Sequence, residues 1–309
     1  MSRNYKGYTV TFKTLSPLLL SPRTSCAFYR DALLDDDDAE FFKIGDSDEY
    51  YNIIYPSYRY GEYEFFDPAK MHSSPEEALS NPKKTLYYIP GSSIKGALTA
   101  GTDCKRAPIS FMVDDAAEQF LKKDFRVISP LKSQYFGTLP KKDCWKEIEG
   151  RAKSTKKSPT DKIPIPKLGP FFSGTVGVEV LCADVTFSTV IHCTEDIDSI
   201  INNALSATNE KLERYLQQLK DFVERIVELK NRCSENDKKP CQTTIESLDR
   251  IIEFTESQLV DNPKKSLLFL GGYKGLLRSC GSKAIPNQSA IFTDDEYRPF
   301  GYIDVISWK

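Results

Sequence analysis

The strongest hydrophobic pattern in this chain lies in its last third, where two segments repeat apolar residues at helical spacing. Residues 209–231 carry an apolar side chain every three or four positions, and residues 243–259 do the same. Such a stripe is typical of an α-helix that buries one face. The connector at 233–240 is polar and short enough to reverse the chain. We therefore predict an antiparallel helical hairpin that packs onto the body of the protein.

Shorter segments have the alternation and composition of β-strands. They are residues 8–14, 50–66, 86–89 and 176–191, the second as a hairpin or two short strands and the last as two runs. In the first, Val10 and Phe12 share one face and polar residues share the other. Residues 113–123 and the stretch that begins at Ser74-Pro75 are typical of helices. The chain is thus predicted to mix strands with helices.

Composition describes an ordinary globular chain. Of the 309 residues, 40% are hydrophobic and 28% are charged, which excludes a predominantly disordered protein. No apolar run is long enough for a membrane span, and the start of the chain lacks the apolar centre of a secretory signal. We therefore expect a cytoplasmic protein.

The net charge and the cysteine and histidine content limit the classes of function that are expected. The net charge of −2 argues against a protein that coats nucleic acid everywhere and leaves room for local basic patches. One such patch is predicted at 151–167, a basic loop. The eight cysteines form no CxxC pair, and only two histidines exist, His72 and His192. Disulfides, a metal site and histidine-based catalysis are therefore not expected, and no cofactor is predicted.

The segment at 89–101, IPGSSIKGALTAG, follows a predicted strand and opens a helix. Ser92 and Ser93 can cap that helix, and Gly91 would let the backbone approach a ligand closely. Lys95 adds positive charge near unpaired N–H groups, which suits a phosphate. The segment lacks the Lys-Ser or Lys-Thr pair of a nucleotide-hydrolysing P-loop. A plain, well-capped turn is the alternative interpretation.

A second glycine-rich segment lies at 270–278, LGGYKGLLR. Glycines at 271, 272 and 275 would let the backbone lie against a polynucleotide, because they leave no side chains in its path. Tyr273, Lys274 and Arg278 would supply an aromatic ring and charge. The segment is thus a second candidate contact for a nucleic-acid strand.

These segments together resemble the RAMP superfamily of CRISPR proteins, and most closely the cap subunits of type III-A (Csm) effector complexes. The motifs that carry the resemblance are Thr14-Leu15-Ser16-Pro17, PGSSIKGAL at 90–98, LGGYKGLLR at 270–278 and RPFGYIDV at 298–305. Two positions depart from the family pattern. Thr99 stands where the family usually has Arg, and residues 18–22 replace a small glycine or serine stretch.

The resemblance implies an α+β fold with a ferredoxin-like or RRM-like RAMP core and a C-terminal glycine-rich loop. The core would span 1–195, a helical insertion 196–262, and the rest of the core 263–309. It also implies a non-catalytic subunit that caps a filament of related RAMP subunits near the 3′ part of the guide RNA and supports its maturation in antiviral defence. The RNA contacts would be Ser92, Ser93, Lys95, Gly271, Gly272, Tyr273, Lys274 and Arg278. Partners would be guide RNA, other RAMP and small subunits, and a host nuclease.

Three alternatives stay open at this point. The first is a metal-independent, guide-processing endoribonuclease in which His72 or His192 acts as general base. The second is an enzyme with an acid-held metal, for which Asp114-Asp115 is a candidate by residue type only. The third is an interaction protein that docks a partner on the helical hairpin. Within the RAMP resemblance itself, another type III RAMP subunit also stays open.

Overall fold

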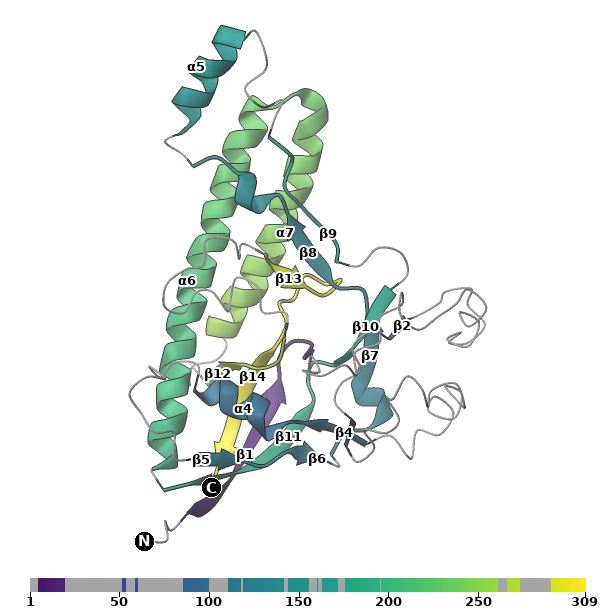
Figure 1. The fold of residues 1–309 in the computed structure, drawn as a ribbon, viewed down its shortest axis with the longest axis vertical. Helices are drawn as coiled ribbons and strands as arrows, with labels where there is room; N and C mark the ends of the chain where they lie inside the picture. The colour runs from purple at the N-terminus through teal and green to yellow at the C-terminus, as the bar shows by residue number, and fades with distance from the viewer. Residues whose placement is uncertain are drawn as a thin grey trace.

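The protein has a mixed α+β fold built on a curled antiparallel sheet (Figure 1). The computed structural model describes residues 5–19, 52–53, 59–60, 86–99, 111–117, 119–141, 144–155, 160, 163–171, 176–194, 196–260, 266–272 and 290–309. The predicted helix after Ser74-Pro75, and His72, lie outside these residues. No helix within the described ranges is long and apolar enough to cross a membrane.

The main sheet has five strands in the order β12-β14-β1-β11-β5. All four neighbouring pairs are antiparallel. The strands are β1 (Lys6–Thr14), β5 (Phe111–Val113), β11 (Thr186–Cys193), β12 (Leu267–Phe269) and β14 (Tyr302–Trp308). The predicted alternation in β1 is confirmed, since Val10 and Phe12 are buried while Thr9 is exposed. The Phe12 ring stacks on Phe187 of β11 at 5.3 Å between centroids.

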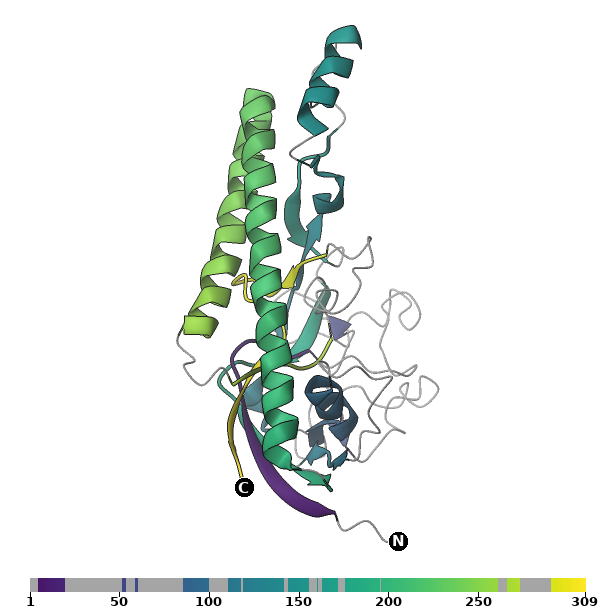
Figure 2. The same cartoon turned by 90° about the vertical axis from the view of Figure 1, so that its left-hand side faces the viewer.

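Two helices cover one face of this sheet. They are α4 (Gly91–Leu98) and the first turns of α6 (Ile197–Arg232). Ile94, Leu98 and Ile201 pack against Val10 and Phe12 in a single core cluster. Figure 2 shows both helices on the same side of β1, with the opposite side of the strand uncovered at its lower end. The core thus lies between the sheet and these two helices.

The predicted helical hairpin is confirmed, and both helices are longer than predicted. The second half of α6 runs antiparallel to α7 (Glu235–Val260), and the connector forms the turn at 233–234 and the first turns of α7. Asp196 caps α6, because its carboxylate accepts a hydrogen bond from the Ser199 amide. Leu212, Leu219 and Leu248 are fully buried in a second core cluster.

Among the described residues, nine further short strands form three small sheets beside the main one. These are β2 (Asn52–Ile53) with β10 (Val176–Leu181) and β7 (Phe125–Ile128), β13 (Phe292–Thr293) with β8 (Leu131–Gln134) and β9 (Lys167–Pro170), and β3 (Arg59–Tyr60) with β4 (Leu86–Ile89) and β6 (Ala116–Ala117). Strands were therefore predicted correctly at 86–89 and twice within 176–191. The two strands within 50–66 pair with β10 and β4 and not with each other.

One sequence prediction is wrong and another is wrong at its ends. The predicted helix at 113–123 is instead the end of β5, strand β6 and the start of a 3₁₀ turn, η3 (Lys122–Asp124). Of the predicted basic loop at 151–167, residues 151–155 belong to helix α5 (Trp145–Thr155) and Lys167 begins β9, while residues 163–166 lie in neither a helix nor a strand. In the first case the backbone bonds to the neighbouring strand, since the Asp114 amide donates to the Val190 carbonyl at 2.9 Å. Tertiary pairing thus overrides the local pattern.

A glutamine side chain continues the main sheet where β5 ends. The Gln119 amide nitrogen donates to the Ser188 carbonyl at 2.8 Å, and the Ser188 amide donates to the Gln119 side-chain oxygen at 2.8 Å. These two bonds copy the pair that a neighbouring strand would make with β11. Both backbone groups of Ser188 are therefore satisfied by a side chain.

Two thiols at the end of the hairpin should be chemically inert. Cys233 and Cys241 are buried, and burial together with the neighbouring Cys233 raises the pKa of Cys241 to about 12. Because the thiolate is the reactive form, we expect iodoacetamide at a pH of about 8 to leave both unmodified in the native protein. Site-resolved mass spectrometry should find them labelled only after denaturation, and native labelling of Cys241 would contradict this structure of the hairpin.

Candidate functional site

Three of the motifs singled out in the sequence meet at one junction of backbone segments. The Tyr302 carbonyl accepts from the amides of Leu15 and Ser16, and the Tyr302 amide donates to the Ser16 hydroxyl at 2.9 Å. The Gly301 amide donates to the Pro17 carbonyl at 2.9 Å. The segment after β1 is thus bonded directly to the RPFGY segment that opens β14.

The glycine-rich segment joins the same junction. The Leu270 amide donates to the Gly301 carbonyl at 2.8 Å, and the Gly272 amide donates to the Leu19 carbonyl at 2.7 Å. We call residues 14–19, 270–272 and 298–302 the motif junction. Leu19 and Gly272 are the last residues of two of its three segments, and the Gly272 amide bonds one to the other.

Glycine is required at two positions of the motif junction. Gly271 has a φ of +86° and Gly301 a φ of +84°, a conformation that side chains disfavour. A Cβ on Gly271 would lie 2.5 Å from the Leu19 carbonyl oxygen, and one on Gly301 would lie 2.0 Å from that of Leu270. These two glycines let backbones of this chain approach one another; the approach to a polynucleotide expected at Gly271 stays a prediction.

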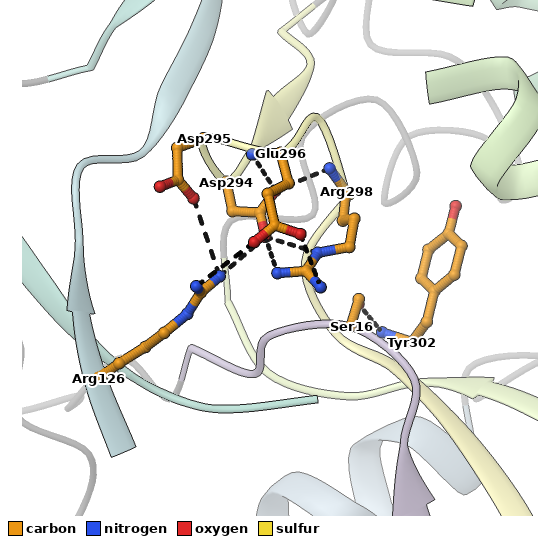
Figure 3. A network of polar contacts seen from close by, with 7 residues as sticks. All are labelled: Ser16, Arg126, Asp294, Asp295, Glu296, Arg298 and Tyr302. Carbon is orange, nitrogen blue, oxygen red and sulfur yellow. Dashed lines mark hydrogen bonds and ion pairs between the residues drawn. The ribbon is translucent and has the colours of Figure 1, made fainter. Parts of the chain in front are cut away.

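A buried carboxylate fixes the loop that leads into the motif junction (Figure 3). Asp294 is fully buried and accepts from the Arg298 side chain at 2.7 and 2.8 Å and from the Arg126 guanidinium at 3.2 Å. Its other oxygen accepts from the backbone amides of Glu296 and Arg298. The loop between β13 and β14 is thereby tied to β7, the strand that carries Arg126.

Burial and the Arg298 partner shift the pKa of Asp294 in opposite directions. Burial raises the pKa of this carboxyl above its ordinary value, and the hydrogen bonds and charge of Arg298 oppose that rise. The acid is therefore tolerated in the core only through its arginine partners. Sequence reasoning missed this group. A turn signal is visible at 294–297, but the contact with Arg126 spans 168 positions.

The PGSSIKGAL motif forms α4 as predicted, but its start is capped differently. Neither Ser92 nor Ser93 makes a side-chain cap bond. The Gly91 amide donates instead to the Asp115 carboxylate at 2.7 Å, so an acid of this chain occupies the positive end of the helix. A Cβ on Gly91 would lie 2.0 Å from the Val113 carbonyl oxygen. Gly91 thus lets α4 approach β5 closely, and Ser92 remains exposed.

Lys95 lies on the same helix and faces β5. Its ammonium donates to the Phe111 carbonyl at 2.7 Å and lies 5.2 Å from the centroid of the Phe111 ring. Lys95 and Asp115 therefore join α4 to the two ends of the β5 region. The lysine is half-buried, and its observed contacts hold α4 against Phe111. The RNA contact expected from the sequence stays a prediction.

The residues expected to contact RNA lie in three places: on helix α4, in the motif junction and outside the described residues. Ser92, Ser93 and Lys95 lie on α4, whose apolar side packs in the same core cluster as Leu18 and Leu270. Gly271 and Gly272 lie in the motif junction. Tyr273, Lys274 and Arg278 lie outside the described residues. The two sets of motifs are thus joined through one core.

The histidine and acid candidates of the alternative functions meet each other. His192 Nε2 lies 3.0 Å from a carboxylate oxygen of Asp114, and both side chains are partly exposed. Asp115 points to Gly91 instead. Within the described ranges, no group of three potential metal ligands comes together.

Comparison with known proteins found no match for this chain. No protein-family model matches the chain, and no curated protein does so either. The functional argument therefore rests on the motifs and on where the fold places them.

Proposed function

We propose that this protein is a non-catalytic RNA-binding subunit of a type III-A CRISPR effector complex, which caps the backbone filament near the 3′ part of the guide RNA. The observation that carries the proposal is the motif junction. Motifs that are over 250 residues apart in sequence, Ser16-Pro17 and Phe300–Tyr302, bond to each other and to the glycine-rich segment. A shared RNA-binding edge would explain why these particular segments are brought together.

The proposed core is of the ferredoxin-like RAMP kind. In chain order β1, α4, β5, β11, α6 and β14 give a βαββαβ succession. Their strands lie in the order β14-β1-β11-β5, with both helices on one face and β12 added outside β14. This arrangement supports the proposal, because it is the strand order of that fold.

The chain would hold RNA by its backbone. The exposed Ser92 hydroxyl and the cations at 274 and 278 would contact phosphates and sugars without reading sequence, and Gly271 and Gly272 would leave no side chain in the path of the strand. Sequence choice would be left to base pairing between guide and target. The remaining partners in this proposal are neighbouring RAMP and small subunits and a host nuclease, in the cytoplasm.

One observation favours the endoribonuclease as a second candidate. The Asp114 carboxylate would orient His192, which is the arrangement of a general base and its positioning acid. In that case a His192→Ala variant would lose RNA cleavage while it keeps RNA affinity.

The proposal is tested by titrating a labelled single-stranded RNA with the purified chain across a salt series and assaying the same samples for cleavage. Lys274→Ala should weaken binding and reduce the salt slope by about one. The control is Lys220→Ala on α6, which removes the same charge from an exposed ion pair with Glu256 and should leave binding unchanged. Lys95→Ala is unsuitable, because it would also release Phe111.

Equal loss of affinity in the two lysine variants would refute a localised site. Cleavage without added metal, abolished by His192→Ala, would favour the processing nuclease instead.

A further inference from the structure

The small sheet β13-β8-β9 has two unlike faces. Its inner face carries Ser133, which is buried, and Leu168, which packs with the hairpin cluster. Because side chains alternate along a strand, the opposite face carries Lys132 and Gln134 of β8. In register with them are Lys167 of β9 and Phe292 of β13.

Two aromatic rings flank the central lysine of this outer face. Lys132 Nζ lies 5.1 Å from the centroid of the Phe171 ring and 5.6 Å from that of Phe292. The two rings meet edge to face at 5.3 Å. Both are partly exposed. A cation between two aromatic rings is thus presented on one surface, which we call the aromatic platform (Lys132, Phe171 and Phe292).

The neighbouring residues suit a polyanion. Lys167, opposite Gln134, is exposed and ends the basic stretch that begins at 151. Strands β8 and β9 contain no acidic residue. Tyr135, directly after β8, is 51% exposed. The nearest acids in sequence, at 294–296, are paired with Arg126 and Arg298.

The platform is continuous with the motif junction. Phe292 packs against a cluster that contains Leu19 and Phe300, and the Leu19 carbonyl is the acceptor of the Gly272 amide. Figure 1 shows β8 and β9 extending from the level of β13 along the helical hairpin toward α5. A strand held at the glycine-rich segment could therefore continue over the platform.

We propose that the aromatic platform is a second contact for single-stranded RNA, in which bases stack on Phe171 and Phe292 and Lys132 and Lys167 contact phosphates. Base stacking on aromatic rings beside cations binds single strands without sequence preference. The inference rests on the proposed RNA-binding function, and it adds Lys132, Phe171 and Phe292, which belong to none of the sequence motifs.

The test compares Phe171→Leu/Phe292→Leu and Lys132→Gln with wild type in the same salt-series titration, after thermal denaturation has shown that each variant folds. Leucine keeps apolar volume and removes the ring. We expect roughly tenfold weaker binding for the double variant, and a salt slope lower by about one for Lys132→Gln. Phe120→Leu, which changes a partly exposed ring packed on Phe125 and Phe187, is the matched control and should bind like wild type.

Photo-crosslinking gives a readout that does not depend on affinity. Irradiation of the wild-type complex should attach RNA to peptides that contain Phe171 or Phe292. If Lys274→Ala loses affinity while the platform variants bind normally and no such crosslink forms, the platform is refuted and the RNA-binding function stands. If the wild-type chain binds no single-stranded RNA, both proposals fall.

Discussion

Replacement of Gly91 by alanine should destabilise the protein by at least about 3 kcal/mol, although alanine is a better helix former than glycine. The added Cβ would lie 2.0 Å from the Val113 carbonyl oxygen and 2.8 Å from that of Asp114. Backbone atoms at such distances cannot yield by a rotamer change, so α4 and β5 would have to separate. Separation would also break the bond from the Gly91 amide to Asp115.

The same helix provides the control. Gly96 is exposed, and a Cβ there meets nothing within 4 Å. Gly96→Ala should therefore be neutral or stabilise the protein by about 0.5–1 kcal/mol, because alanine is the better helix former. Urea denaturation of the two variants checks the pair. Similar midpoints would mean that α4 does not approach β5 as closely as the structure has it.

Removal of the Arg298 side chain is expected to cost about 3 kcal/mol at neutral pH. Arg298→Ala leaves Asp294 fully buried with Arg126 as its one remaining arginine partner. A buried charge that loses its partner is among the most costly defects in a folded protein. The loop between β13 and β14 would lose its anchor, and with it the geometry at Gly301.

The pH dependence of the stability of Arg298→Ala tests whether the buried Asp294 carboxylate causes the loss. Burial raises the pKa of Asp294, and Arg298→Ala removes the side-chain hydrogen bond and the charge that oppose this rise, while the backbone N–H at position 298 still donates to the carboxylate. The folded variant should therefore take up a proton more readily than the unfolded chain, so its stability rises as the pH falls and is lost as the pH rises through the folded-state pKa. Chemical denaturation at pH values of about 5.5 and 7.5 measures this.

Lys220→Ala serves as the control for charge removal. Its ion pair with Glu256 is about half exposed, so the loss should stay below about 1 kcal/mol and vary little with pH. A deficit in Arg298→Ala that does not shrink on acidification would show that Asp294 is not held as a buried carboxylate.

Much of the scaffold was predictable because its strands and helices follow from the local spacing of apolar residues. The alternation of Val10 and Phe12 identified the central strand, and the helical stripe identified the hairpin. Helix α6 begins at Ile197, twelve residues before the predicted stripe, and its first turns bury Ile197, Ile201 and Ala204 at the same helical spacing against the sheet. One helix thus serves both the core and the hairpin.

The candidate site was predictable only as a set of motifs. Nothing in the segment PGSSIKGAL reveals that an aspartate 24 positions later caps it, so Ser92 and Ser93 looked like the capping groups. The region at 113–123 looked helical for the same reason: Asp114 and Asp115 resemble an acidic helix start but bond to His192 and Gly91. Contacts between distant segments decide such positions, and no single-segment pattern encodes them.

The side chain of Gln119 limits how this protein can assemble. An open strand edge invites another chain to add a strand, in filaments and in aggregates alike. At Ser188 that route is closed, because the glutamine amide already takes both backbone groups. Growth of the sheet past this point would require Gln119 to withdraw.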